Sequence, residues 1–165
     1  MVLLTAKHIQ KRFSEKQLLE DINLSIHLGD KIGLVGVNGS GKSTLLQIIA
    51  GAMEEDAGEI LRSNELRIGY LPQNPDFEPE ATVLEQAMEY VQGAVPEYVV
   101  KTLLTKLRMN MFDRKMKALS GGQRKRVAMA AVMCRDTNLL ILDEPTNHMD
   151  NDIIEWLEEQ LENYK

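Results

Sequence analysis

The sequence predicts an α/β fold in which a block of helices is inserted into a core of strands and helices. The first 35 residues and the segment around residue 70 contain short apolar or alternating runs, which are typical of strands. Residues from about 76 to 131 show helical periodicity and helix-capping residues. An apolar run at 138–143 and an amphipathic helix after it then resume the α/β pattern.

The N-terminal segment is expected to form strands. The runs "LLTAKHI" (3–9) and "INLSI" (22–26) are apolar or alternating, and the turn "HLGD" (27–30) closes the second. The next run, "KIGLVG" (31–36), is almost continuously apolar, which is the pattern of a strand buried on both faces. We therefore expect three strands before residue 37.

A glycine-rich loop then leads into a helix over "KSTLLQIIA" (42–50). Gly51 is placed to end this helix, because glycine adopts the left-handed backbone of a helix terminus at little cost. The runs "GEILR" (58–62) and "LRIGYL" (66–71) predict two more short strands.

The middle of the chain is expected to be helical. Thr82 can cap a helix, and Glu85 completes a capping box three residues later. Gly93 is expected to end that helix, and Pro96 to begin another that runs to residue 110. A third helix is expected over 120–134.

The last two elements are a strand and a helix. "NLLILD" (138–143) reads as an apolar strand, and residues 151–164 place apolar side chains on one helix face opposite four glutamates. We expect one domain over 1–165, with a core at 1–75 and 132–165 and a helical subdomain at about 76–131.

The composition is that of a globular protein in a reducing compartment. The chain has a single cysteine, Cys134, which cannot form an internal disulfide. No stretch approaches the roughly 20 apolar residues of a membrane span, and the N-terminus is too short and polar for a signal peptide. We therefore expect a cytoplasmic protein without direct membrane insertion.

The net charge of −6 argues against nucleic-acid binding through the field of the whole domain. Two basic groups remain candidates for a local patch, and the alternative for both is a solvent-exposed helix face. They are Arg124, Lys125 and Arg126, and Arg114, Lys115 and Lys117.

The loop "GVNGSGKST" (36–44) predicts a nucleoside triphosphate site. It matches G-x-x-x-x-G-K-[ST] at Gly36, Gly41, Lys42 and Ser43, between a predicted buried strand and a helix. Glycines let successive N–H groups converge on phosphate oxygens, and the helix N-terminus adds a positive dipole. Lys42 can reach the β- and γ-phosphates, and the Ser43 hydroxyl can bind Mg²⁺.

Asp143 and Glu144 follow the predicted strand at 138–143. Triphosphate-hydrolysing proteins with this loop need an acid at the end of a second strand to hold Mg²⁺, and Asp143 fits that role. Glu144 is then free to polarise the water that attacks the γ-phosphate, which favours hydrolysis over binding alone.

The segment "LSGGQRKRV" (119–127) contains a second candidate anion-binding helix start, because Ser120 can cap the helix and two glycines leave N–H groups exposed. Together with the loop at 36–44, the "LDE" at 142–144 and Gln73 after a strand, it closely resembles the signature of ATP-binding-cassette (ABC) ATPases. All the motifs occur in that family's order, and the resemblance spans the chain.

The resemblance implies an ABC-type P-loop NTPase fold, with a mixed central sheet, additional N-terminal antiparallel strands and an inserted α-helical subdomain. It implies an ATPase that binds ATP and Mg²⁺, in which Ser43, Gln73 and Asp143 contact the metal and Gln73 also contacts the attacking water. The other nucleotide-binding positions that it implies are Phe13 for adenine stacking, Asn38, Gly39, Ser40 and Thr44 in the P-loop, Gly121, Gly122 and Gln123 in the signature, and Asp150 at the end of the D-loop.

The resemblance also explains the second anion site. Cassettes of this family pair head to tail, so Ser120 and Gly122 would contact the γ-phosphate held by the partner's P-loop. ATP would then favour the closed pair, and hydrolysis would reopen it.

The stretch "EPTNHMD" (144–150) resembles the ABC-F group of soluble, twin-cassette translation proteins more than transporters, which typically have small or apolar residues after "EPT". The run "IIEWLEEQLENY" (153–164) agrees with that group. This implies the ribosome, through rRNA or tRNA, as a partner of the full-length protein. His148 is expected to be a surface residue of the D-loop.

Two alternatives stay open. One is the ATP-binding subunit of a membrane transporter, and the other is an ATP-gated clamp that does not hydrolyse ATP, against which the intact Glu144 argues. In the family a further strand ending in a histidine follows, so we expect the chain to be C-terminally truncated and weak or inactive as an ATPase on its own. The interval 73–119 leaves little room for the helical arm that the first cassette of the ABC-F group often carries.

Overall fold

The computed structural model describes residues 1–92, 95–147 and 149–164. The expected helix stop at Gly93 and the expected surface position of His148 lie outside these residues. The chain divides into two compact units, one formed by 1–68 with 137–141 and the other by 69–136 with 142–164. The second unit therefore combines the helices of the middle segment with residues 142–164, which we expected to belong to the core.

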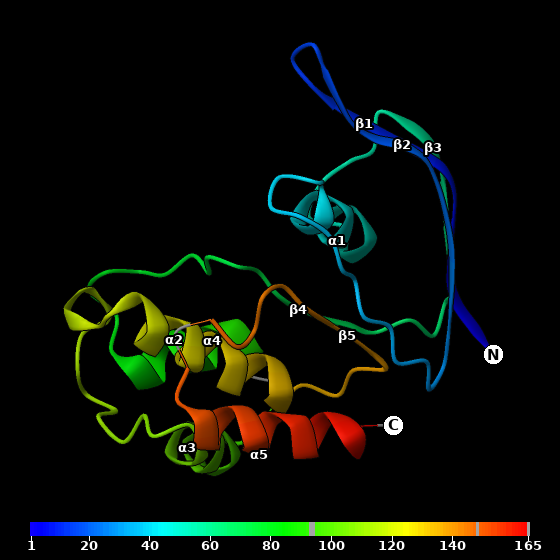
Figure 1. The fold of residues 1–165 in the computed structure, drawn as a ribbon. Helices are drawn as coiled ribbons and strands as arrows, with labels where there is room; N and C mark the ends of the chain where they lie inside the picture. Colours follow the sequence, from blue (N-terminus) through cyan, green and yellow to red (C-terminus); the bar gives the residue numbers. More distant parts are fainter. Residues whose placement is uncertain (93–94, 148, 165) are drawn as a thin grey trace. The chain divides into compact units, whose positions relative to one another are not determined.

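The first unit contains a three-stranded antiparallel sheet of order β2-β1-β3, formed by β1 (Val2–Phe13), β2 (Lys16–His27) and β3 (Ala57–Arg62). The helix α1 (Lys42–Ala50) lies beside this sheet (Figure 1). Leu4 and Ile9 of β1 and Ile48 of α1 are fully buried, and Arg62 of β3 donates a hydrogen bond to the Ile48 carbonyl at 3.2 Å. The Arg62 hydrogen bond thus joins β3 of the sheet to α1.

The expected buried strand at 31–36 is wrong. The structure has no strand over 31–37, and Ile32 and Val35 are 55% and 94% exposed. A doubly buried strand needs hydrogen-bonded neighbours, and each sheet among the described residues is made of other strands. Apolar character alone therefore does not determine whether residues 31–36 form a strand.

The pair β4 (Ile68–Leu71) and β5 (Leu139–Leu142) forms a two-stranded sheet, and the chain passes from one unit to the other within these strands. Leu139 donates its N–H to the Arg67 carbonyl at 3.2 Å, and Asp143 donates to Leu71 at 3.0 Å. The partners advance together along both strands, so the pair is parallel.

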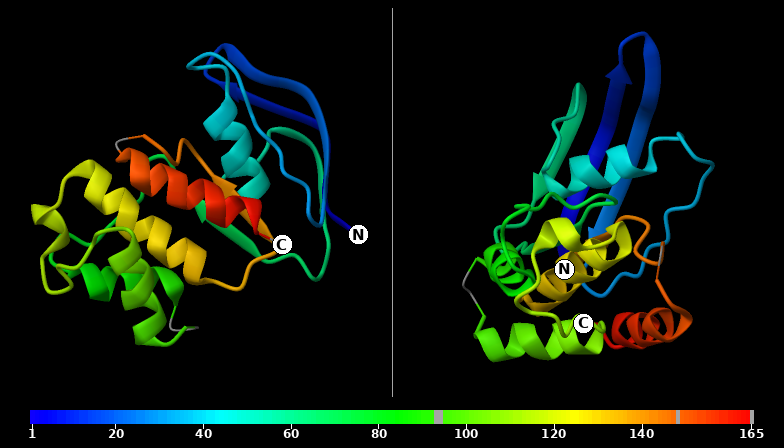
Figure 2. Two further views of the ribbon diagram at one scale, coloured as in Figure 1. Left: turned by 60° about the horizontal axis from the view of Figure 1, so that its bottom comes forward. Right: turned by 90° about the vertical axis from the view of Figure 1, so that its left-hand side faces the viewer.

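The second unit contains α2 (Val83–Val91), α3 (Glu97–Lys106), the short 3₁₀ turn η1 (Met116–Ala118), α4 (Gly121–Cys134) and α5 (Asn151–Glu162). The helices α2 and α3 both pack on α4 (Figure 2). The predicted capping box is confirmed: Thr82 accepts from the Glu85 N–H at 3.2 Å, and Glu85 accepts from the Thr82 N–H at 2.7 Å. The helix α3 ends before the expected residue 110, because Arg108 adopts a left-handed backbone with φ 58°.

The fold class is confirmed as mixed α/β with antiparallel N-terminal strands. Among the described residues, no helix is both long and apolar enough to cross a membrane.

Candidate active site

The P-loop lies in the first unit and ends at the start of α1. Gly41 precedes the helix with a φ of 96° and has no side chain to cap it. The first N–H groups of a helix lack intrahelical acceptors, so this terminus can receive an anion. A Cβ on Gly41 would lie 2.9 Å from the Leu19 side chain, so both the backbone angle and the available space require glycine here.

Lys42 extends back into the P-loop. Its ammonium donates hydrogen bonds to the carbonyls of Gly36 at 2.7 Å and Val37 at 3.1 Å. The positive charge therefore lies within the loop whose N–H groups would bind phosphate. The other expected P-loop residues lie at the same place: Asn38, Gly39 and Ser40 are exposed, and Ser43 and Thr44 are in the first turn of α1.

Phe13, the candidate for adenine stacking, ends β1 in the same unit. Its side chain is 47% exposed, and the Lys11 ammonium lies 5.9 Å from the ring centroid. An exposed aromatic face is suited to stacking on a planar base.

Asp143 follows β5 in the second unit. It is buried, and its Oδ2 atom has no hydrogen-bond partner among the described residues. A buried carboxylate oxygen without a partner is costly unless a cation or a donor approaches it. No cluster of three or more metal-ligating side chains occurs in the described part of the chain, and Mg²⁺ typically takes one or two carboxylates and completes its shell with water and phosphate. The Asp143 carboxylate, with one oxygen free of hydrogen bonds among the described residues, thus fits a protein ligand of Mg²⁺.

Glu144 is held by two amides. Its Oε2 atom accepts hydrogen bonds from Gln73 Nε2 at 2.8 Å and from Asn147 Nδ2 at 2.6 Å. Its backbone is left-handed with φ 46°, a conformation that costs a non-glycine residue energy and is frequent at functional sites. The structure thus brings together Gln73 and Glu144, two of the expected site residues.

Lys125 was missed as a site residue. It is buried on α4, and its ammonium donates to the backbone carbonyls of Asp143, at 3.2 Å, and Glu144. Burial lowers the pKa of Lys125, and the Asp143 and Glu144 carboxylates oppose that shift. The signal was present in the sequence, because Lys125 shares the i, i+4, i+7 stripe with the buried Met129 and Val132.

The run at 124–126 is therefore not a solvent-exposed helix face. Besides the buried Lys125, Arg124 lies 4.1 Å from the Phe77 ring centroid and Arg126 forms an ion pair with Asp150. Arg124 and Arg126 are half-buried, and α2 and α3 both pack on α4.

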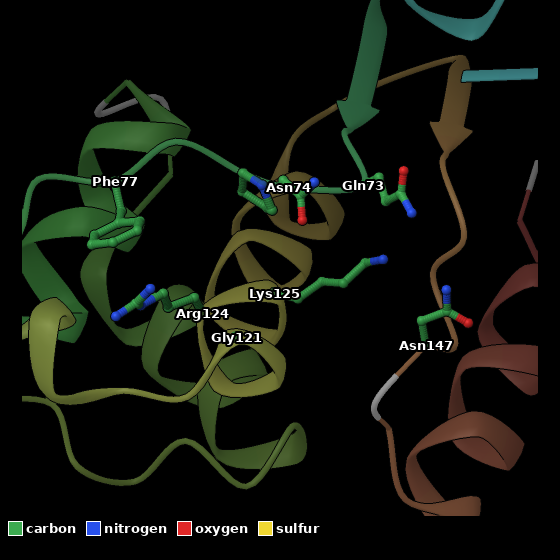
Figure 3. Close-up of a pocket in the computed structure, with 8 residues that line it drawn as sticks. Gln73, Asn74, Phe77, Gly121, Arg124, Lys125 and Asn147 are labelled. Atoms are coloured by element: carbon green, nitrogen blue, oxygen red, sulfur yellow. The ribbon is translucent and has the colours of Figure 1, made fainter. Parts of the chain in front are cut away.

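A cavity of about 250 Å³ lies beside this network (Figure 3). Lys125 extends from α4 toward the space between Gln73 and Asn147. The volume is enough for several water molecules near polar groups. The lining residues are Gln73, Asn74, Pro75, Phe77, Gly121, Arg124, Lys125 and Asn147.

The signature forms the N-terminus of α4. Ser120 accepts from the Gln123 N–H at 3.2 Å, and Gln123 accepts from the Ser120 N–H at 3.0 Å, which is a second capping box. Gly121 is exposed, and a Cβ there would have no neighbour within 4 Å. Gly122, the next residue, is half-buried, and Asp150 precedes α5 and is exposed.

The comparisons with known proteins agree with these motifs. Residues 19–147, more than half of the chain, match the sequence profile described as "ABC transporter". The chain belongs to the ABC transporter family. Domains of this family bind ATP, and the family generally hydrolyses it.

Several relatives are similar along nearly all of the chain. It is 36% identical to an uncharacterized ABC transporter ATP-binding protein, YfmR of Bacillus subtilis, with 99% of this chain and 32% of YfmR covered. It is 33% identical to the energy-dependent translational throttle protein EttA of Escherichia coli, with coverage of 92% and 35%. The ATP-binding protein Uup of Escherichia coli is 36% identical, with coverage of 91% and 25%. The chain thus spans about a third or less of the length of these relatives.

Solved structures show the same fold. The ATP-binding subunit of an ABC transporter has a TM-score of 0.85 at 26% identity, with 98% of this chain and 74% of that chain covered. The ABC cassette MJ0796, in a dimeric post-hydrolysis state bound to ADP and Pi, has a TM-score of 0.83 at 25% identity, with coverage of 98% and 82%.

Proposed function

We propose that the chain is an ATP-binding and ATP-hydrolysing cassette of an ABC-F protein, in which closure of two cassettes on ATP regulates translation on the ribosome. The assignment to the ABC-F group rests on the stretch "EPTNHMD" at 144–150. Its support is the 33% identity to EttA, whose name describes a translational throttle.

ATP binding is assigned to the first unit. The N–H groups at the start of α1 and the Lys42 ammonium would hold the triphosphate, because they combine a positive charge with converging donors. Phe13 would stack on the adenine.

Mg²⁺ would be held by Ser43, Gln73 and Asp143, and Asp143 has the unpartnered oxygen for it. When bound, the ion would neutralise charge on the β- and γ-phosphates. Glu144 would orient the attacking water and accept its proton, since its carboxylate is already held in one orientation by Gln73 and Asn147.

The partner that this function requires is a second cassette, placed head to tail. Ser120, Gly121, Gly122, Gln123 and Asp150 are the residues assigned to the partner's nucleotide. The dimeric MJ0796 cassette supports this arrangement. The Ser120–Gln123 capping box uses the Gln123 N–H, and the N–H groups of Gly121 and Gly122 would remain for the partner's nucleotide.

Ribosome contact through rRNA or tRNA, in the cytoplasm, belongs to the same proposal. The alignment with YfmR runs over 204 positions and this chain has 165 residues, so at least 39 positions have no residue of this chain opposite them. A long helical arm has little room in 73–119, so we assign ribosome contact to other surfaces of the protein.

The test is Glu144→Gln in the purified full-length protein, with the same change in the second cassette where the chain carries one. We expect ATP turnover to fall about 100-fold or more while ATP affinity is kept, since only the proton acceptor is lost. The variant should also sediment with ribosomes in the presence of ATP. Unchanged turnover would contradict the hydrolytic role of Glu144 and favour a non-hydrolytic clamp.

The second candidate is the ATP-binding subunit of a membrane transporter, favoured by the similarity to a solved subunit of that kind. Copurification with membranes, without ATP-dependent sedimentation with ribosomes, would support it over the translation role.

A further inference from the structure

Asn147 reaches back to Glu144 across a tight turn. The Asn147 N–H lies 3.4 Å from the Glu144 carbonyl, and the Asn147 side chain donates to Glu144 Oε2 at 2.6 Å. A residue three positions along a turn is well placed to bond the first residue through a short side chain. The hydrogen bond therefore follows from the turn and from the length of the asparagine side chain.

Gln73 donates to the same oxygen from the segment after β4. Two donors on Oε2 fix the plane of the carboxylate, and among the described residues no hydrogen bond to Oε1 occurs. One oxygen is thus used for orientation, and the other is left to accept a proton.

The main chain of Glu144 is held as well. Lys125 donates to the Glu144 carbonyl, and the residue keeps its left-handed backbone. Among the described residues, only the Gln73 and Asn147 amides donate hydrogen bonds to the Glu144 carboxylate. Each amide can therefore be removed separately and its effect on the carboxylate measured.

We propose that Asn147 is a positioning residue for the reaction: its amide orients Glu144 as the proton acceptor for the attacking water. This rests on the proposed function of Glu144. Asn147 is exposed, so its contribution to the core is small and its loss leaves the fold intact.

The test uses Asn147→Ala, Asn147→Asp and Asn147→Ser in the purified full-length protein. We expect N147A to lower kcat about tenfold with little change in the KM for ATP, because orientation and not binding is lost. N147D keeps the shape but replaces the donor with a carboxylate that repels Glu144, so kcat should fall further. N147S retains a donor and should recover part of the N147A loss.

The order of the variants separates the proposal from a purely structural role. A role in turn shape alone predicts that N147D is milder than N147A, and that result would overturn the proposal. Wild-type kcat in N147A, or a loss confined to KM, would overturn it too. Asn151→Ala and Asn151→Asp are the controls, since Asn151 is an exposed asparagine in the first turn of α5.

Failure of the two proposals is distinguishable. If E144Q retains turnover, the proposed function of Glu144 fails. If E144Q abolishes turnover but N147A and N147D turn over ATP as the wild type does, only the positioning role of Asn147 fails.

Discussion

Arg126 in α4 forms an ion pair with Asp150, the residue that precedes α5, with Nη2 and Oδ2 2.9 Å apart. The Arg126 side chain is 13% exposed and that of Asp150 is 57% exposed. Arg108, just beyond α3, adds contacts to Asp150 at 3.9 Å and to Asp152. The end of the D-loop is thereby connected to the helix that carries the signature.

Arg126→Ala should lower the free energy of unfolding by about 1 kcal/mol. The partly buried stem loses packing, while the ion pair itself contributes little because Asp150 is exposed to solvent. Urea denaturation followed by circular dichroism measures the change. Lys106→Ala, an exposed position at the end of α3, is the control, and an equal loss there would show that the Arg126 contacts add no stability.

Features with local causes were predictable from the sequence. Thr82 with Glu85 and Ser120 each start a helix where expected, because a cap depends on residues within one turn. Gly51 ends α1 in a left-handed conformation, as its position predicted. The order of the motifs was enough to identify the family.

Features that depend on distant partners were not predictable. The run at 31–36 is apolar, but whether a strand forms depends on which segments pair with it. Arg126 looks like part of a solvated charge run until its ion pair with Asp150 is known. The hydrogen bond from Gln73 to Glu144 joins segments that are far apart in the sequence, so it depends on the pairing of β4 with β5.

Ser120→Ala and Thr82→Ala form a matched pair of substitutions. Each removes the hydroxyl of a capping box, so each should destabilise the protein by about 1 kcal/mol. Under the proposed function only S120A should also weaken ATP-dependent association of cassettes, because Ser120 is assigned to the partner's nucleotide. Thermal melts and cassette association in ATP measure the two effects. If cassettes of both variants associate equally well in ATP, the role of Ser120 is confined to capping α4.

The Asp56 carboxylate is held by two donors from β1. Lys11 Nζ lies 2.7 Å from Oδ1, and the Arg12 N–H donates to Oδ2 at 2.8 Å. The hydrogen bond from the Lys11 side chain, and then that from the Arg12 backbone, lower the pKa of Asp56 below its ordinary 3.8. The folded state thus binds this proton less readily than the unfolded chain does.

Asp56→Asn should therefore lower Tm at neutral pH by an amount that disappears in acid. A carboxyl whose folded-state pKa is depressed stabilises the fold above its unfolded value and loses that contribution as pH falls through the folded value. The difference in Tm between wild type and D56N should shrink as the pH falls from about 7 toward about 2. Asp113→Asn is the control, at an exposed acid without an ion pair or side-chain hydrogen bond to the described residues, and its Tm at neutral pH should stay close to that of the wild type. A gap between wild type and D56N that is independent of pH would mean that the ionised form of Asp56 is not what stabilises this contact.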